Sequence, residues 1–148
     1  MATALLATPT PDAIWRATAE DAEKVNDWVW RDSGNRADFM AFLAEPLNVC
    51  LVSGEGGAIF VWRGPGIYEV HVFFEQRGSE VLKLSRQMLD IMRREFGARM
   101  FWAAVPTDST SRHVRLFTRF MGWKSQGEVM QPQGRCEVFL EDSACRQQ

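Results

Sequence analysis

The chain has 148 residues, 46% of them apolar and 24% charged, which is enough to bury the core of one globular domain. Its formal charge of −2 at pH 7 gives no nucleic-acid signature, and no segment approaches the roughly 20 apolar residues that span a membrane. Its three cysteines are widely spaced from one another and from both histidines, which predicts a reduced, cytoplasmic compartment and no metal site.

The first half of the chain predicts two helices between strands. Residues 1–12 are small, polar and interrupted by proline, so we expect a flexible N-terminal arm before a single domain at 13–141 and a polar tail at 142–148. Thr18 and Asp21 form a capping pattern at the start of the first helix. The expected elements are a strand at 14–17, helices at 18–34 and 36–43, and strands at 48–52, 58–62 and 67–75.

The second half of the chain adds a long amphipathic helix and a final hairpin. Apolar residues recur at helical spacing over 79–96, and the continuous apolar run at 100–105 predicts a strand buried on both faces. A further helix at 107–122 precedes paired strands at 123–130 and 135–140. A strand, a helix and a strand in this order require a right-handed crossover between parallel neighbours. We therefore predict an α/β domain with a mixed sheet and helices on both faces.

This order of elements, taken with particular residues, resembles the GCN5-related N-acetyltransferase (GNAT) fold, and the resemblance spans nearly the whole chain. The matching segments are the Thr18–Ala22 opening, the meander into Val70–Phe74, the turn at Arg77 and Gly78, and Val105 and Pro106 before a helix that ends in Met121–Trp123. The resemblance implies a central sheet of six to seven strands. It also implies acetyl-CoA-dependent transfer of an acetyl group to an amine substrate.

A narrower likeness is to small GNAT-like proteins of tailed phages. The shared features are the strand segment Tyr68–His71, Met88 and Leu89 within the amphipathic helix, and the polar cluster Thr107–Ser111 before Arg115 and Gly122. Those relatives include internal virion and head-assembly proteins. The likeness therefore implies a virion-associated protein with other virion proteins as partners, located in the host cytoplasm or the virion.

Carried over from the family, the cofactor contacts fall at the end of the 67–75 strand and in the turn that follows it. They are Val72, Phe73 and Phe74 for the thioester, and Gln76, Arg77, Gly78 and Ser79 for the pyrophosphate of coenzyme A. Glu75 and Glu80 flank that turn. A carboxylate about 4 Å from a phosphate costs on the order of 4 kcal/mol at an effective dielectric of about 20. In the alternative interpretation Glu80 stabilises its own helix N-terminus. We expect no bound cofactor, or acetyl-CoA if the chain is active.

Family members often protonate the leaving thiolate with a tyrosine on the helix before a Gly-Phe pair. The matching position, counted back from Gly122 and Trp123, is Thr118, and its neighbour is Phe117. Neither side chain is a useful acid, because a threonine hydroxyl is far too basic and phenylalanine has no acidic group. Tyr68 is the only tyrosine of the chain and lies on a different element. The sequence therefore argues against ordinary catalysis.

A general base is expected on the 67–75 strand, where Glu69 and His71 alternate onto one face. Imidazole titrates near neutrality, so this pair can serve an amine acceptor. In the structural alternative, His71 is hydrogen-bonded within a half-buried sheet and Glu69 is solvated. The resulting hypothesis is a phage-type GNAT-like protein with a degenerate acetyltransferase site. An active acetyl-CoA-dependent N-acyltransferase is the alternative, and a module that binds CoA or a nucleotide without turnover is a third class.

Overall fold

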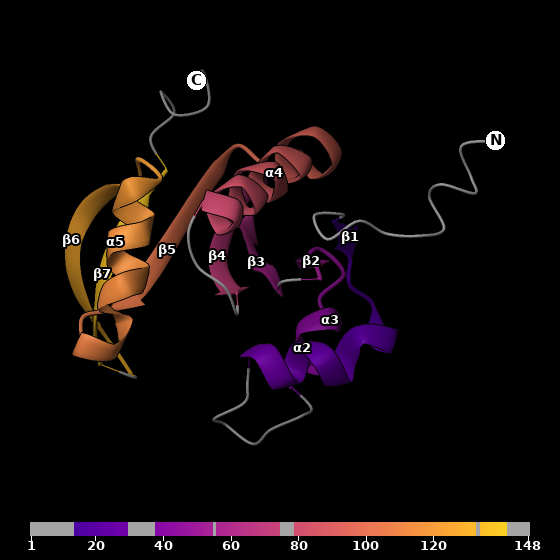
Figure 1. The fold of residues 1–148 in the computed structure, drawn as a ribbon. Helices are drawn as coiled ribbons and strands as arrows, with labels where there is room; N and C mark the ends of the chain where they lie inside the picture. The colour runs from indigo at the N-terminus through magenta and orange to yellow at the C-terminus, as the bar shows by residue number, and fades with distance from the viewer. Residues whose placement is uncertain (1–13, 30–37, 55, 75–78, 133, 142–148) are drawn as a thin grey trace.

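The computed structural model describes residues 14–29, 38–54, 56–74, 79–132 and 134–141. These residues form a seven-stranded mixed sheet with helices on both faces, as the sequence predicts (Figure 1). The predicted arm at 1–12 and the predicted tail at 142–148 lie outside the described residues.

The strands follow the order β1-β2-β3-β4-β5-β7-β6 across the sheet. Their bounds are Trp15–Arg16 (β1), Val49–Ser53 (β2), Gly56–Gly64 (β3), Ile67–Phe74 (β4), Met100–Pro106 (β5), Lys124–Gln131 (β6) and Gly134–Leu140 (β7). Every neighbouring pair is antiparallel except β4 and β5, which are parallel. That parallel pair confirms the predicted crossover through the long helix between the two strands.

The first helical segment begins where the sequence places its cap. Their bounds are Ala19–Asp21 (η1), Ala22–Val29 (α2), Asp38–Leu43 (α3), Ser79–Phe96 (α4), Ser109–Ser111 (η2) and Arg112–Phe120 (α5). The backbone N–H of Thr18 donates to Asp21 Oδ2 at 2.8 Å, and that of Glu20 donates to Thr18 Oγ1 at 3.3 Å, which confirms the predicted capping. The predicted end of the first helix, Gly34, lies outside the described residues. None of these helices is long and apolar enough to cross a membrane.

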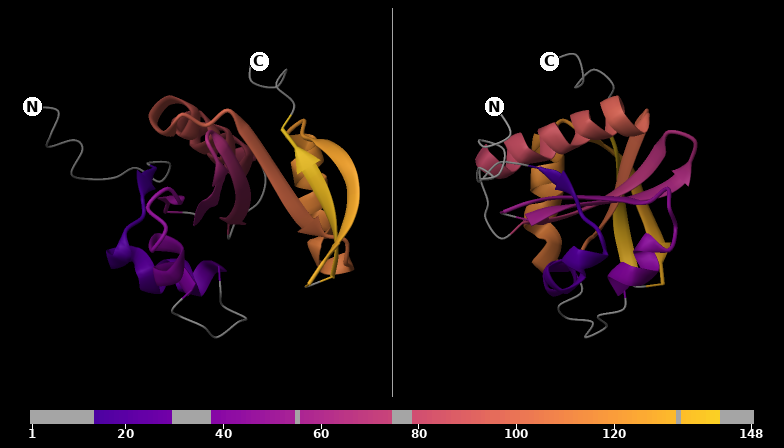
Figure 2. Two further views of the ribbon diagram at one scale, coloured as in Figure 1. Left: turned by 180° about the vertical axis from the view of Figure 1, so that it is seen from behind. Right: turned by 90° about the vertical axis from the view of Figure 1, so that its right-hand side faces the viewer.

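The helices cover the two faces of the sheet unequally. In the right-hand view of Figure 2, α4 lies above the sheet, and α2 and α3 lie below it. The larger core, beneath α4 and α5, is built on Phe60, Met88, Met92, Phe101 and Phe139. The smaller core, against α2 and α3, is built on Val25, Phe39, Cys50, Val52 and Ile59. Strand β4 separates the two cores, with Tyr68 and Val70 in the larger one and Phe73 against the smaller one, as its alternation predicts.

Strand β5 corrects one expectation, because it is buried on one face only. Phe101, Ala103 and Val105 are buried, whereas Trp102 and Ala104 between them are half-buried. The smaller core rests on β2 and β3, and it does not extend across the sheet to β5. A continuous apolar run is therefore compatible with a strand that has one helix-covered face and one face that no described helix covers.

Candidate functional site

The two parallel strands diverge soon after they begin. Their register runs from Ile67 opposite Met100 to Glu69 opposite Trp102, and the ladder ends there. Beyond that point β4 remains paired with β3, and β5 remains paired with β7. The later residues of β4 and β5 therefore turn backbone N–H and C=O groups toward a gap instead of toward each other. Such groups are obligatory hydrogen-bonding groups, so they can bind a ligand in the gap.

Gly66 holds the two strands together at their start. Its carbonyl oxygen accepts from the N–H groups of Arg99 at 2.7 Å and Met100 at 3.0 Å, so β5 begins beside the beginning of β4. Gly66 has φ of +75°, and an added Cβ would lie 2.9 Å from Arg99 Nε. Both the backbone conformation and the close approach favour glycine at this turn. Because the starts are fixed, the divergence opens only toward the carboxyl ends of the strands.

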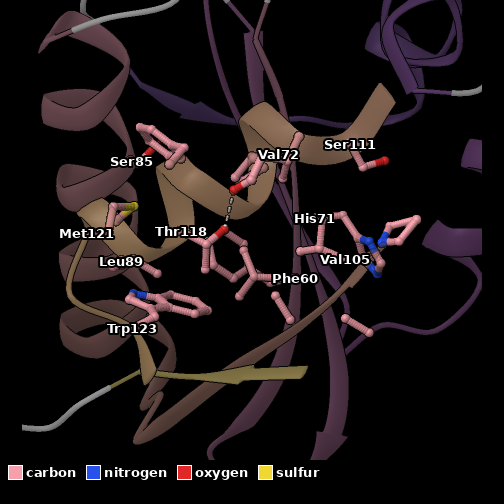
Figure 3. A pocket seen from close by; sticks show the side chains of 17 residues that line it. Phe60, His71, Val72, Ser85, Leu89, Val105, Ser111, Thr118, Met121 and Trp123 are labelled. Atoms are coloured by element: carbon pink, nitrogen blue, oxygen red, sulfur yellow. Dashed lines mark hydrogen bonds between the residues drawn. The ribbon is translucent and has the colours of Figure 1, made fainter. Parts of the chain in front are cut away.

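A cavity of about 160 Å³ occupies this divergence, between α4 and α5 (Figure 3). Its deep walls are apolar, formed by Phe60, Leu89, Phe117, Met121 and Trp123 among others. Val72 and Val105 line the cavity from the helix-covered face of the sheet, and His71 and Ala104 line it from the opposite face. The cavity therefore passes between the two strands, so groups on both faces of the sheet meet in it.

Thr118 lines the cavity from α5, at the position that matches the tyrosine acid of the family. Its side chain is buried, and its Oγ1 donates to the Val114 carbonyl oxygen at 2.7 Å (Figure 3). Tyr68 is buried and packs edge-on against Phe60, with the ring centroids 6.4 Å apart. Burial raises the pKa of the Tyr68 phenol above its ordinary value. Neither residue is placed to protonate a leaving thiolate, in agreement with the sequence argument.

The structure brings the predicted pair Glu69 and His71 together on β4. Glu69 Oε2 lies 2.7 Å from His71 Nε2, and Glu69 Oε1 accepts from Arg63 Nε at 2.9 Å and from Arg63 Nη2 at 2.6 Å. Glu69 is only 9% exposed, so the expectation of a solvated carboxylate is wrong: the β3–β4 hairpin folds Arg63 over it. The His71 side chain is 46% exposed.

These contacts keep the Glu69 carboxyl group ionised and identify which ring nitrogen of His71 can accept a proton. The hydrogen bond from His71, followed by that from Arg63, lowers the pKa of Glu69 from its ordinary 4.5 to about 2. An ionised carboxylate can only accept, so His71 Nε2 carries the hydrogen of this bond. In the neutral ring, Nδ1 then carries a lone pair. Glu69 therefore orients the imidazole, and His71 Nδ1 is the atom available as a base.

The remaining predicted contacts fall partly outside the described residues. Val72 is 38% exposed and lines the cavity. Phe73 packs against the smaller core and Phe74 against the larger one. Ser79 is the exposed first residue of α4. The undescribed contacts are Gln76, Arg77 and Gly78. The roles of all these residues toward a cofactor stay predictions.

Sequence reasoning missed two polar residues of the site, Arg63 and Ser85. In the sequence Arg63 reads as a turn residue, and only the hairpin register places it against Glu69. Ser85 is buried on α4 and lines the cavity. A signal for Ser85 exists in the helical spacing, because it is the polar member of the buried face of α4. The other buried members of that face are Val81, Leu84, Met88, Leu89 and Met92.

No protein-family model matches the chain, and no curated protein matches it in sequence. Solved structures do share its fold. Aminoglycoside acetyltransferase AAC(6')-Ib in complex with coenzyme A aligns with a TM-score of 0.71 at 14% identity, over 91% of this chain and 96% of that one. YncA from Salmonella typhimurium, with its cofactor acetyl-CoA, aligns at 0.63 and 17% identity, over 88% and 94%. The F149A mutant of spermidine N-acetyltransferase SpeG from Vibrio cholerae aligns at 0.69 and 8% identity, over 86% and 93%.

These alignments cover nearly all of the chain and most of each neighbour, so they compare whole domains. They give no support to a phage or virion origin. Their low sequence identities limit the comparison to architecture: the mixed sheet, the crossover through α4 and the helices on both faces. In its architecture, the chain has the fold of the GNAT acetyltransferases.

Proposed function

We propose that the chain is an acyl-CoA-dependent N-acyltransferase that acylates an amine. The observation that carries this proposal is the apolar cavity at the β4–β5 divergence, with the Glu69–His71 pair at its edge. Two structural neighbours, a spermidine and an aminoglycoside N-acetyltransferase, act on amines with this fold, which supports the proposal by analogy alone.

The residues of the cavity fit a thioester on a long, partly apolar arm. Beyond the end of their shared ladder, β4 and β5 offer backbone groups to its carbonyls and amides, and Leu89 and Phe117 offer apolar contact. The buried Ser85 hydroxyl has no hydrogen-bond partner among the described residues, so a polar ligand atom can satisfy it. When bound, acyl-CoA supplies an acyl group activated as a thioester. Residues 76–79 remain the proposed contacts of its pyrophosphate.

In this proposal His71 is the general base. Its Nδ1 accepts a proton from the attacking amine, while the ionised Glu69 holds the ring and stabilises the imidazolium. The Thr118 hydroxyl is already committed to the Val114 carbonyl oxygen. Among the described residues no tyrosine, cysteine or lysine side chain lines the cavity, so the departing thiolate receives its proton from solvent.

A second candidate is a non-catalytic protein of a phage virion, with other virion proteins as partners. It is supported by the sequence likeness at Tyr68–His71 and by Thr118 in place of the tyrosine of the family. In that case the fold serves as a scaffold, and the cavity has no cofactor to bind. The two candidates therefore differ in one measurable property, the affinity for acyl-CoA.

A thermal-shift titration with CoA and acetyl-CoA separates the two candidates. A ligand at 100 times its Kd adds about 2.7 kcal/mol to the free energy of unfolding, which gives a clear rise in melting temperature. We expect this rise with both ligands, followed by thiol release from acetyl-CoA in the presence of a panel of primary amines. No rise at millimolar ligand removes the acyltransferase proposal. A rise without thiol release favours a module that binds CoA without turnover.

A further inference from the structure

The hydroxyl of Ser85 is a buried polar group that lacks a hydrogen-bond partner among the described residues. In the part of the chain that the structure describes, three buried side-chain polar atoms lack a hydrogen bond: Ser85 Oγ, Gln87 Oε1 and Arg93 Nε. Of these three residues only Ser85 lines the cavity, where it lies on the α4 wall (Figure 3). Ser85 is 4% exposed. Buried polar groups are nearly always satisfied, so this exception calls for an explanation.

Thr118 shows what such a hydroxyl usually does in a helix. It lines the same cavity from α5, and it donates to the carbonyl oxygen of Val114, four residues earlier, at 2.7 Å. The corresponding carbonyl for Ser85 is that of Val81, and the Ser85 hydroxyl does not bond to it. Among the described residues, this donor therefore has no hydrogen-bond acceptor.

Water is a poor partner for Ser85 in this position. A buried water needs two to four polar contacts to be held. The cavity lining is mostly apolar, with Val72, Leu89 and Val114 among its residues, and Thr118 already uses its hydroxyl hydrogen. A carbonyl oxygen on an otherwise apolar ligand matches this environment better, because it needs one donor and leaves the walls in apolar contact.

We propose that Ser85 is a ligand-binding residue whose hydroxyl donates to a carbonyl oxygen of the acyl-thioester arm. This inference rests on the proposed function and adds a specificity-determining contact to it. The carbonyl belongs to an amide of the pantetheine arm or to the thioester itself. Both sources share the same chemistry, and they differ in whether CoA without an acyl group can supply the oxygen.

The test measures the Kd of CoA and of acetyl-CoA by calorimetry for the wild-type chain, Ser85→Ala and Ser111→Ala. Ser111 is the matched control, because it is a serine that lines the same cavity but is only half-buried, and its backbone N–H donates to Asp108 Oδ1 at 2.9 Å. Loss of one neutral hydrogen bond weakens binding roughly 3- to 10-fold. We expect that loss for Ser85→Ala and less than about a twofold change for Ser111→Ala. Equal loss for both ligands assigns the contact to a pantetheine amide, and loss for acetyl-CoA alone assigns it to the thioester.

The melting temperature without ligand separates binding from packing. Removing an unsatisfied hydroxyl leaves no group unpaired, so Ser85→Ala should melt at or above the wild-type temperature. Ser85→Thr keeps the hydroxyl and should bind more tightly than Ser85→Ala. Unchanged affinity in Ser85→Ala, or a parallel fall in stability and affinity, overturns the inference while the proposed function stands. A wild-type chain that binds neither ligand overturns the proposed function itself.

Discussion

Glu69 and Trp102 form the last pair of the parallel β4–β5 ladder, and the cavity opens beyond them. Two residues further along each strand, His71 and Ala104 lie on the same face of the sheet and line the cavity from opposite sides. The end of one ladder therefore sets both the position of His71, the proposed base, and the point where the cavity opens. An amine that reaches His71 meets a thioester only if that thioester occupies the gap between the strands.

Filling this gap should abolish ligand binding without unfolding the protein. Ala104 is half-buried on the uncovered face, so Ala104→Phe should place its ring in the mouth of the cavity and remove the thermal shift with acetyl-CoA. Val138 is the matched control, because it pairs with Ala104 across β5 and β7, is also half-buried, and does not line the cavity. Val138→Phe should keep the full shift. If both variants respond to acetyl-CoA as the wild type does, the ligand binds elsewhere.

The Glu69 carboxylate should make stability depend on acid pH. Its pKa is lowered in the folded protein to about 2 from an ordinary 4.5, so it contributes stability above pH 4.5 that is lost as the pH falls toward 2. The size is on the order of 2–3 kcal/mol, discounted because His71 and Arg63 are themselves about half exposed. Glu69→Gln should therefore lower the free energy of unfolding at pH 6 and flatten its decline between pH 4.5 and 2.

Urea denaturation at several pH values measures this effect, with Glu128→Gln as the control. Glu128 pairs with Arg135 at 3.5 Å on the exposed edge of the sheet, where both side chains are more than half exposed. Exposed pairs of this kind contribute little, so the control should stay within about 0.5 kcal/mol of the wild type. If the free energy of unfolding of Glu69→Gln falls between pH 4.5 and 2 as steeply as that of the wild type, the Glu69 contacts do not hold in solution.

His71 and His113 are the two histidines of the chain, and only His71 lines the cavity. If His71 Nδ1 is the base, His71→Gln should lower kcat/KM for amine acylation by roughly 100- to 10,000-fold. The Kd for acetyl-CoA should change little, because the cavity walls stay in place, whereas the melting temperature should fall if glutamine does not replace the hydrogen bond that His71 gives Glu69. His113→Gln, on the exposed side of α5, should retain wild-type rates. Equal rates for both variants would remove His71 from the mechanism.

Structural features that depend on residues close together in the sequence can be predicted from the sequence. The helix at 79–96 has the predicted bounds because one amphipathic period and a following glycine determine it, and the Thr18 cap is likewise a contact between near neighbours. The cavity was not predictable in the same way. It depends on β4 and β5 parting after Glu69 and Trp102, which is a relation between residues 33 positions apart (102 minus 69).

The errors have the same origin. The apolar sequence of β5 gives no sign that α2 and α3, which pack against β2 and β3, do not extend to β5. Glu69 reads as a solvated partner of His71 because nothing near it in the sequence shows that Arg63 folds over it. The helical spacing places Ser85 on the buried face of α4, but only the position of α5 across the cavity shows that this face also lines a binding site.

The charge of Glu80 gives a prediction in which stability and affinity move in opposite directions. Glu80 is exposed in the first turn of α4, where a negative charge stabilises the helix by about 0.3–1 kcal/mol. The same charge repels a pyrophosphate at that helix start. Because Glu80 is exposed, water screens the repulsion well below the 4 kcal/mol expected for a less hydrated pair. Glu80→Gln should therefore destabilise the chain slightly and tighten CoA binding about two- to fivefold at low salt.

Salt and position provide the controls for this charge effect. The gain in affinity should shrink as ionic strength rises, because the Debye length falls from about 30 Å at 0.01 M to about 10 Å at 0.1 M. Glu95→Gln removes an exposed carboxylate near the other end of the same helix and should leave the affinity unchanged. If Glu80→Gln, Glu95→Gln and the wild type bind CoA equally at low salt, the phosphates do not sit at the start of α4. The acidic flank would then be no obstacle to the cofactor.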